Sequence, residues 1–355
     1  MKEYAAALEK IEAVLEEALP AQAGSAWLDR VFPSLDGLYP EQTMALLEPG
    51  RDLFKRGGKR WRPLLAYLVC RTLGGADAVL PLLPLVEFPH NASLIHDDLE
   101  DNSGERRGKP AVHLLYGSDT AINSGCFLYF LPLAVLENWE GSPENRDRIW
   151  RLWAEHMRLL HLGQSMDIAW HRDLALIPSI EEYMLMCGLK TGCLARFAAL
   201  LGAEAAGFGG NRVSPDMTLS LGEAAQKLGV GFQILDDVKN LSTGIPGKKR
   251  GDDVVEGKKS LPVLLFLAGS GGLNDRGLND RLAFVSRCFK AAGEGVSVPE
   301  VEEFIGALTE AGALAEAEKR GQALIAEAGA FFANLGDQQD PEAGKLLAGL
   351  TELLR

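Results

Sequence analysis

The chain has 355 residues, of which 47% are apolar, so it is long enough to bury a large hydrophobic core. Its formal net charge of −13 argues against nucleic acid as a partner, because a phosphate backbone attracts basic surfaces. The five cysteines are odd in number and form no Cys-x-x-Cys pair, which is typical of reduced thiols. We therefore expect a cytoplasmic protein.

The N-terminal segment predicts an amphipathic helix, with apolar residues at Leu8, Ile11, Val14, Leu15 and Ala18. It lacks the basic start and unbroken apolar run of a signal peptide. No stretch reaches the roughly 20 apolar residues that a membrane span needs, so we expect no integral membrane segment.

The rest of the chain predicts long helices, because apolar residues recur at i, i+3, i+4 and i+7 and few runs alternate apolar and polar residues. Clusters of Gly, Pro or Asn predict breaks between helices at 32–40, 74–75, 141–143, 207–215 and 243–251. A doubled Gly-Leu-Asn-Asp-Arg between Gly269 and Arg281 predicts a surface loop. No linker divides the sequence, so we expect a single all-α domain over residues 1–355.

Two acidic pairs carry the strongest chemical signal, Asp97-Asp98 followed by Asp101, and Asp236-Asp237 followed by Asn240. On a helix, residues at i and i+4 lie one above the other, so each motif offers several oxygen ligands on one face. Mg²⁺ usually binds one or two carboxylates together with substrate phosphates. Acidic clusters are more often solvated helix surface, but each of these follows an apolar run, which favours a shared metal site.

Basic residues lie near glycine in three further segments, 57–63, 105–110 and 247–259. Arginine forks match phosphate oxygens, and glycine lets the backbone approach a ligand closely. Each cluster alone is more often a solvated surface. The acidic and basic clusters together favour a site for a diphosphate and magnesium.

These motifs resemble those of the trans-isoprenyl diphosphate synthase (polyprenyl synthetase) family, and most closely those of its geranylgeranyl diphosphate synthases. The resemblance rests on motifs in the order of the family, Gly57–Pro63, His90–Ser103 with Arg106–Gly108, Gly163–Asp167, Lys190–Gly192, Phe232–Asp237 and Gly257–Lys258. It implies an isoprenoid synthase domain with its motifs between about residues 50 and 265. The implied fold is a single bundle of long antiparallel helices around a central cavity, with the two acidic motifs facing each other.

The implied reaction is the Mg²⁺-dependent head-to-tail condensation of isopentenyl diphosphate with an allylic diphosphate. The allylic substrate loses its diphosphate to give a carbocation, which the double bond of isopentenyl diphosphate attacks. No protein base is evident, and in this family the departing diphosphate is thought to take the proton. The resemblance also implies a homodimer.

The resemblance assigns roles to individual residues. It implies magnesium ligands at Asp97, Asp98, Asp101, Asp236 and Asp237. It implies an allylic diphosphate site at Arg106, Lys190, Lys249 and Lys258, and an isopentenyl diphosphate site at Lys59, Arg62, His90 and Arg107. Around the forming cation it implies Gln164 and Thr191, and it gives Gln233 a supporting role on the helix of the second motif. The catalytic residues that it implies are Lys190, Thr191, Gln233, Asp97 and Asp98.

Two positions bear on metal binding and product length. Asn240 stands where many family members have a third aspartate, which predicts weaker metal contact there without loss of activity. Ala92 and Ser93, just before the first motif, stand where aromatic residues close the pocket of fifteen-carbon synthases. Their small size predicts a product of twenty carbons or more, although small residues also simply let helices pack closely.

Four other functions remain as alternatives. A longer-chain synthase would keep the same chemistry with a deeper pocket. A class I terpene cyclase is disfavoured because Asn240 and Gly244 break its second metal motif. A non-catalytic subunit is disfavoured because the first acidic motif is intact, and a helical scaffold would not explain matched acidic and basic clusters.

Overall fold

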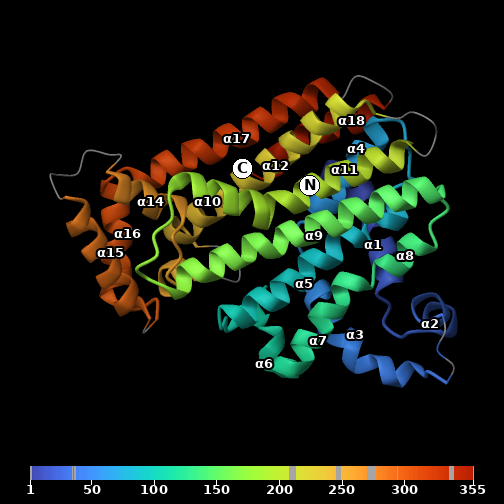
Figure 1. Ribbon diagram of the computed structural model, residues 1–355, viewed down its shortest axis with the longest axis horizontal. Helices are drawn as coiled ribbons and strands as arrows, with labels where there is room; N and C mark the ends of the chain where they lie inside the picture. The colour runs from blue at the N-terminus through green and yellow to red at the C-terminus, as the bar shows by residue number, and fades with distance from the viewer. Residues whose placement is uncertain are drawn as a thin grey trace. The chain divides into compact units, whose positions relative to one another are not determined.

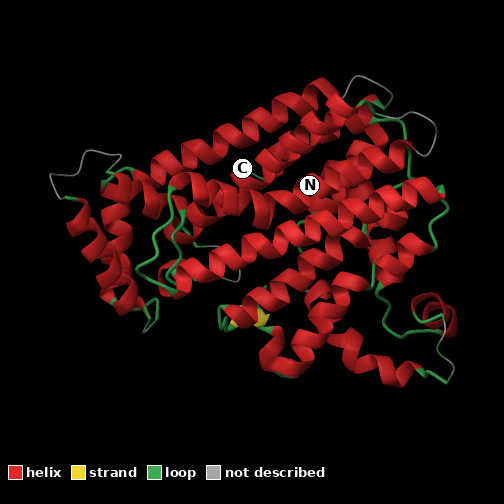
Figure 2. Ribbon diagram, viewed as in Figure 1, coloured by secondary structure: helices red, strands yellow, loops and turns green. Residues whose placement is uncertain are grey.

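The computed structural model describes residues 2–33, 35, 37–207, 213–244, 249–269, 277–293, 295–335 and 340–354. These residues form helices almost throughout, as Figures 1 and 2 show, and the all-α prediction is confirmed. In this described part the only strands are the two-residue β1 (Glu105–Arg106) and β2 (Lys109–Pro110). The first copy of the doubled Gly-Leu-Asn-Asp-Arg lies within residues 270–276, outside the described residues. The second copy, residues 277–281, begins a helix at Leu278, so the predicted surface loop is wrong there.

The chain divides into two compact units. Unit 1 comprises residues 1–156, 194–223 and 330–353. Its own helices are α1 (Ala5–Ala18), α2 (Ser25–Val31), α3 (Pro40–Lys55), α4 (Trp61–Thr72), α5 (Pro84–Glu100), α6 (Val112–Tyr116), α7 (Ser118–Phe130), α8 (Leu133–Glu137) and α18 (Pro341–Gly349), with 3₁₀ turns at Lys2–Tyr4, Leu80–Leu82 and Leu350–Leu353. Within it α5 packs beside α7, and α4 beside α18.

Unit 2 comprises residues 157–193, 224–329 and 354–355. Its own helices are α10 (Ile180–Cys187), the π-helix η3 (Gly188–Gly192), α13 (Asp252–Val255), α14 (Leu261–Ala268), α15 (Leu278–Ala292) and α16 (Pro299–Glu310). Four longer helices have residues in both units, α9 (Pro143–Arg172), α11 (Cys193–Ala206), α12 (Pro215–Ser242) and α17 (Ala313–Leu335).

Unit 2 buries two hydrophobic clusters. In one, Tyr183 and Met186 of α10 pack with Ile234 of α12. In the other, α15 and α16 meet through Phe289 and Phe304, whose ring centroids are 5.3 Å apart.

The predicted helix breaks are confirmed. Helix α2 ends at Val31 and α3 begins at Pro40, and α9 begins at Pro143 after the predicted break at Gly141. The remaining predicted breaks separate α4 from the 3₁₀ turn before α5, α11 from α12, and α12 from α13. Proline at the first turn favours several of these starts, because its missing N–H has no helical partner there.

The predicted N-terminal helix is α1. One of its faces is buried within unit 1, at Ala7, Ile11, Leu15 and Ala18. By length and composition, two segments, Ser118–Glu137 and Ile180–Ala206, are long and apolar enough to cross a membrane. The sequence predicted no such segment. Their most apolar windows are 50% and 78% buried within the protein. Core helices pass the same test, so these segments are weak evidence for a membrane span.

Candidate active site

The first acidic motif ends α5 in unit 1. Asp97 and Asp98 lie in the last helical turn, and Asp101 is the C-cap residue, whose N–H bonds to the Asp97 carbonyl at 2.8 Å. Asp98 is completely buried, whereas Asp97 and Asp101 are partly exposed. The motif therefore presents two carboxylates outward and one inward.

A β-hairpin places Arg106 against this motif. Strands β1 and β2 pair antiparallel, with Arg106 opposite Lys109, and both residues of the connecting turn have positive φ, +53° at Arg107 and +75° at Gly108. Such two-residue turns match the twist of a hairpin. Arg106 Nε donates to Asp98 Oδ1 at 2.7 Å, and Arg106 Nη2 lies 3.7 Å from Asp97 Oδ2. The buried Asp98 thus fixes the guanidinium of Arg106.

Arg56, at the end of α3, holds the hairpin from the other side. Its side chain is fully buried, and Nη1 donates to the carbonyls of Arg106 at 2.9 Å and Pro110 at 3.0 Å. Its Nε donates to Asp52 Oδ2 at 3.0 Å. The Asp52–Arg56 pair therefore ties both strands of the hairpin to α3.

Several cations surround His90 in unit 1. Burial lowers the pKa of His90 well below its ordinary value, and the charges of Arg62 and Arg107 lower it further. Burial also lowers the pKa of Arg107 to about 10. Arg107 Nη1 donates to the Leu53 carbonyl at 3.3 Å. Lys59, which lies just before Arg62 in the sequence, is exposed. His90 is therefore neutral at pH 7 within a cationic cluster.

Arg60 has a structural part in the same segment. It is the N-cap of α4 with φ of +50°, and its guanidinium donates to Glu87 Oε1 at 2.9 Å and to Glu12 Oε1 at 2.7 Å. It therefore fixes the turn that carries Lys59 and Arg62.

In unit 2, the π-helix η3 carries Lys190 and Thr191. Lys190 Nζ lies 2.5 Å from Asp167 Oδ2 of α9. Helix α9 approaches η3 closely at Gly163, where an added Cβ would lie 2.5 Å from the Lys190 nitrogen. π-Helical turns occur often at functional sites, and this one directs two neighbouring side chains to different helices.

A hydrogen-bonded chain links Thr191 to α10. Thr191 Oγ1 donates to Gln233 Oε1 at 2.8 Å, and Gln233 Nε2 donates to Asp237 Oδ1 at 2.8 Å. Tyr183 Oη donates to Asp237 Oδ2 at 2.7 Å. Burial, and then the charge of Asp253, raises the pKa of Asp237 to about 7. Both oxygens of this carboxylate thus already accept a hydrogen bond from the protein.

The remaining residues of the second motif differ in exposure. Asp236 is partly exposed on α12, whereas Asn240 is buried and its Oδ1 accepts from the Asp253 backbone N–H at 3.2 Å. Lys249 is exposed. Lys258 Nζ lies 2.5 Å from Glu256 Oε2. Asn240 therefore supports the backbone that follows α12.

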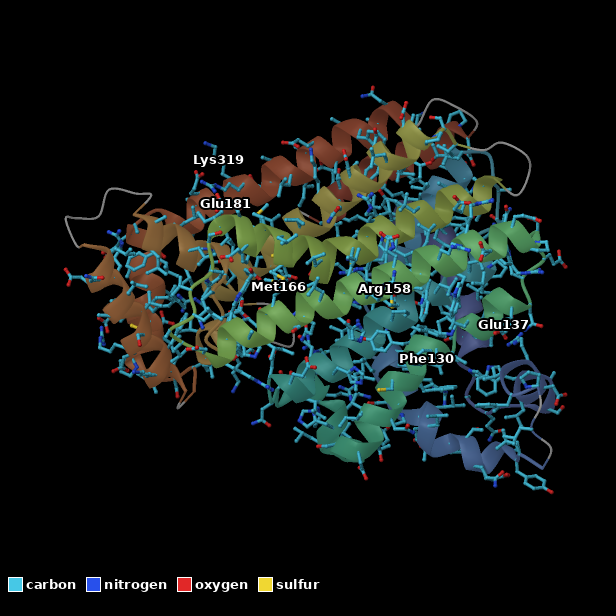
Figure 3. All side chains as sticks on the ribbon, in the orientation of Figure 1. Phe130, Glu137, Arg158, Met166, Glu181 and Lys319 are labelled. Atoms are coloured by element: carbon cyan, nitrogen blue, oxygen red, sulfur yellow. The ribbon has the colours of Figure 1, made fainter. Side chains whose placement is uncertain are left out.

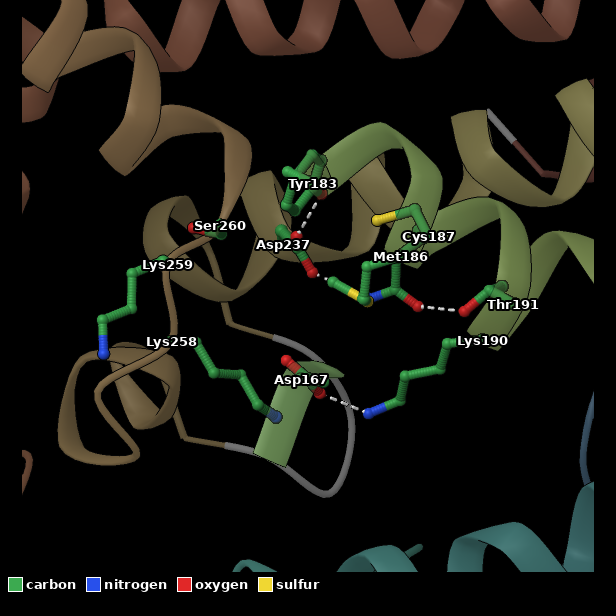
Figure 4. A pocket seen from close by; sticks show the side chains of 11 residues that line it. Asp167, Tyr183, Met186, Cys187, Lys190, Thr191, Asp237, Lys258, Lys259 and Ser260 are labelled. Atoms are coloured by element: carbon green, nitrogen blue, oxygen red, sulfur yellow. Dashed lines mark hydrogen bonds and ion pairs between the residues drawn. The ribbon is translucent and has the colours of Figure 1, made fainter. Parts of the chain in front are cut away.

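A small cavity of about 40 Å³ in unit 2 brings many of the predicted residues together, as Figure 4 shows. Its lining comprises Asp167, Tyr183, Met186, Cys187, Lys190, Thr191, Gln233, Asp237, Lys258, Lys259 and Ser260. Gln164, Asp236 and Lys249 are predicted site residues of unit 2 that are not part of this lining. Unit 1 brings together Asp97, Asp98 and Arg106, and separately Arg62, His90 and Arg107.

Each unit has carboxylates that suit a hard cation. Unit 1 has the partly exposed Asp97 and Asp101, unit 2 has the partly exposed Asp236, and oxygen ligands are what Mg²⁺ requires. Among the residues described, no group of three or more His, Cys, Asp or Glu side chains is gathered closely enough to hold a metal by itself. Substrate phosphates would complete such a coordination sphere.

Four residues in this site had no role in the sequence-based interpretation, Arg56, Asp167, Tyr183 and Lys259. Asp167 lies within the Gly163–Asp167 motif and Lys190 is a predicted site residue, but the ion pair between them was not predicted. Arg56 and Tyr183 act through contacts 50 or more residues away in sequence, which no local pattern reveals.

Comparison with known proteins identifies relatives of this chain. The sequence model of the family described as polyprenyl synthetase matches residues 43–280. The geranylfarnesyl diphosphate synthase of Aeropyrum pernix is 36% identical over 231 residues, covering 62% of this chain and 69% of that protein. The geranylgeranyl pyrophosphate synthase of Rhodocybe pseudopiperita is 35% identical over 258 residues, covering 70% of each chain.

Solved structures show the same architecture. The geranylgeranyl pyrophosphate synthetase of Pyrococcus horikoshii Ot3 superposes with a TM-score of 0.78 at 25% identity, covering 99% of this chain and 96% of that one. A decaprenyl diphosphate synthase from Rhodobacter capsulatus superposes with a TM-score of 0.77 at 25% identity, covering 100% of this chain and 99% of that one.

Proposed function

Because the chain belongs to the polyprenyl synthetase family of trans-prenyltransferases, we propose that it condenses isopentenyl diphosphate with an allylic diphosphate, head to tail, to give geranylgeranyl diphosphate. The observation that carries this proposal is the convergence of Lys190, Lys258 and the Thr191–Gln233 hydrogen bond on one cavity. The two ammonium groups suit the leaving diphosphate, and the neutral hydroxyl oxygen of Thr191 suits the carbocation that remains.

We assign the metal to the outward carboxylates, Asp97 and Asp101 of the first motif and Asp236 of the second. Mg²⁺ bound there would neutralise the negative charge that develops on the departing diphosphate. Asp98 and Asp237 were expected among the ligands too, but their contacts favour another role. Asp98 orients Arg106, and Asp237 orients the amide of Gln233.

The protein would stabilise the allylic cation through Thr191. Its hydroxyl proton is donated to Gln233 Oε1, so the lone pairs of Oγ1 remain for the cavity that Thr191 lines. Electron-rich oxygen that is already oriented stabilises positive charge without reorganisation at the moment of reaction. Gln164 would lie at the edge of this region.

The diphosphates would bind to the two sets of cations. Arg106, Lys190, Lys249 and Lys258 would hold the allylic diphosphate. Lys59, Arg62, His90 and Arg107 would hold isopentenyl diphosphate, with neutral His90 able to donate a hydrogen bond without adding charge repulsion. We also propose a single isoprenoid synthase domain for residues 1–355.

A product assay tests the function. Purified protein is incubated with Mg²⁺, labelled isopentenyl diphosphate and, separately, dimethylallyl, geranyl or farnesyl diphosphate, and the chain length of the product is measured. A twenty-carbon product is expected. A protein that binds Mg²⁺ and substrates but elongates none of the three primers would overturn the proposal and favour a non-catalytic subunit.

A longer product is the second candidate. The observation that favours it is the 36% identity to a protein named geranylfarnesyl diphosphate synthase, together with the small residues Ala92 and Ser93 in the middle of α5. Ala92 is fully buried, and Ser93 Oγ donates to the His90 carbonyl at 2.8 Å. In the same assay this function would give products of twenty-five carbons or more as the main species.

We further propose a cytoplasmic homodimer. Supporting this, unit 1 exposes apolar side chains on α6, α7 and α9, namely Leu114, Leu115, Ile122, Phe130 and Trp150. Phe130, labelled in Figure 3, is 62% exposed, and large exposed apolar groups favour protein interfaces. Sedimentation of the wild type and of Phe130→Asp tests this, with a dimer expected only for the wild type. A monomeric wild type would contradict the proposal.

A further inference from the structure

Lys259 is a buried lysine whose hydrogen-bond acceptors, among the residues that the structure describes, are backbone carbonyls. It is 4% exposed, and among the described residues no carboxylate lies within ion-pair distance of its Nζ. Nζ donates to the carbonyl of Trp170 and, at 3.1 Å, to that of Asp173. Burying an ammonium without a carboxylate is costly, and burial lowers the pKa of this one to about 8.

Trp170 lies in the last turn of α9, which ends at Arg172, and Asp173 directly follows the helix. The last carbonyls of a helix have no partner within the helix, and the helix dipole places negative charge there. A lysine therefore suits this position. It joins the segment that follows α13 to the last turn of α9.

A second contact docks the same segment on the same helix end. Gly257 has φ of +71°, and a Cβ there would lie 3.1 Å from Leu174 Cδ2 and 3.4 Å from the His171 carbonyl. The turn is thus shaped to approach α9 closely. Lys258 lies between these two contacts, so its backbone is fixed on both sides.

The neighbouring lysines point in different directions. In Figure 4 the side chain of Lys258 points toward Asp167, which holds Lys190, whereas that of Lys259 points away. Asp167 lies on α9 one turn before Trp170, and Lys258, Lys190 and Asp167 line the same cavity. The end of α9 therefore supports both Lys190, through Asp167, and the backbone of Lys258, through its two neighbours in sequence.

We propose that Lys259 is a positioning residue for prenyl transfer, which binds the C-terminal carbonyls of α9 and thereby holds Lys258 beside the Lys190–Asp167 pair for the allylic diphosphate. This inference rests on the proposed function, because it takes Lys258 as a ligand of that diphosphate. Lys259 also lines the cavity, but its Nζ donates to the carbonyls of Trp170 and Asp173, so we assign it no hydrogen bond to substrate.

A double-mutant cycle tests the proposal, with Lys258→Met, Lys259→Met and the double variant. For each, kcat and the KM values of both substrates are measured, using the allylic primer that the wild type elongates fastest. Lys259→Met is expected to raise the KM of the allylic diphosphate about tenfold and to change kcat and the KM of isopentenyl diphosphate less than about twofold. The double variant is expected to match Lys258→Met alone, because a residue that acts only through another adds nothing once that residue is gone.

The control is Lys227→Met, which removes a lysine of α12 whose ion pair with Glu327 is exposed and should leave all constants unchanged. Far-UV circular dichroism establishes folding. If Lys259→Met does not fold, Gly257→Ala provides the test, since it displaces the same turn while keeping Lys259, and it should raise the same KM.

The outcomes separate this inference from the proposed function. Additive effects of the two lysine substitutions, or equal rises in both KM values for Lys259→Met, would overturn the positioning role and leave the function of Lys258 intact. An unchanged allylic KM for Lys258→Met would overturn both, because Lys258 would then not bind the allylic diphosphate.

Discussion

Tyr183 Oη donates a 2.7 Å hydrogen bond to Asp237 Oδ2, and this bond is the first of three that connect α10 to Thr191. With Oδ2 taken, Asp237 Oδ1 accepts from the amide nitrogen of Gln233, whose carbonyl oxygen must then face Thr191. An amide turned the other way would offer Thr191 a donor and redirect its hydroxyl. Tyr183 of α10 is thereby linked, through Asp237 and Gln233, to the hydroxyl oxygen of Thr191 in the cavity.

Replacing Tyr183 with Phe should therefore slow catalysis with little effect on substrate binding. We expect kcat to fall about tenfold and both KM values to change little, since a buried acceptor that loses its donor costs about 1–3 kcal/mol. Steady-state kinetics measures this.

The matched control is Tyr4→Phe, because Tyr4 Oη donates a 3.0 Å hydrogen bond to the Leu346 carbonyl far from any site residue in sequence. It should lower the free energy of unfolding by about 1 kcal/mol without changing kcat. Equal kinetic constants for Tyr183→Phe and the wild type would contradict the role of this bond.

The Asp52–Arg56 pair should matter for both diphosphates. Arg56→Met frees the hairpin that carries Arg106 and Arg107, so we expect the KM of each substrate to rise about tenfold. Stability should fall by about 3 kcal/mol, because Asp52 loses its buried partner. Arg51→Met, on the same helix but with an exposed hydrogen bond to the Ala21 carbonyl, should change neither quantity. A loss of stability without any change in KM would show that the clamp is only structural.

The neutral state of His90 predicts a pH dependence of stability. Its pKa in the folded protein is lowered well below the value near 6.5 of an unfolded chain, so the unfolded state binds more protons as the pH falls through that value. Acidification then favours unfolding, by at most about 1.4 kcal/mol per pH unit from this residue. Urea unfolding at pH 7.5 and 5.5 should show a smaller loss for His90→Gln than for the wild type. Parallel losses would contradict a lowered pKa.

Gly163 should not tolerate a side chain. Gly163→Ala would place Cβ 2.5 Å from the Lys190 nitrogen, so α9 and the π-helix must move apart and Lys190 with them. We expect at least about 2 kcal/mol of destabilisation and a lower kcat. Gly306→Ala is the control, because nothing lies within 4 Å of the added methyl group on α16, and it should stabilise the helix by up to about 1 kcal/mol. Thermal unfolding and kinetics of the two variants measure the difference.

Removing metal or a metal ligand should abolish prenyl transfer. A chelator should stop product formation, and added Mg²⁺ should restore it. Asp97→Asn should lower kcat about a hundredfold and raise the Mg²⁺ concentration needed for half-maximal activity. Asp147→Asn, which alters an exposed pair with Arg151, serves as the control. Full activity of Asp97→Asn at low Mg²⁺ would remove this residue from the metal site.

The sequence predicted what depends on local patterns. Helix breaks at Gly141 and before Pro215 follow from single residues, and the acidic pairs follow from helical periodicity. Long-range contacts leave no such pattern, so Arg56 looked like one more basic residue before Gly57. The π-helix was not predicted either, because Gly188–Gly192 has no distinguishing propensity and only its packing between neighbouring helices selects the wider turn.

The second lysine of the Lys258–Lys259 pair shows the same limit. Adjacent lysines of identical chemistry have different environments, one near Glu256 and the other buried at a helix end. The two lysine side chains differ in their burial, and burial depends on tertiary structure, which a local sequence pattern does not reveal.

The cations around His90 also make the protein sensitive to its solvent. Burial, and then repulsion from neighbouring arginines, lowers the pKa of Arg107, so an anion bound among these groups would relieve part of the unfavourable free energy of burying this charge. Binding to the folded state alone raises the melting temperature with anion concentration. Storage and assay in phosphate or sulfate would therefore raise the apparent thermal stability of unit 1 and compete with its substrate, so the choice of buffer becomes part of any measurement on this enzyme.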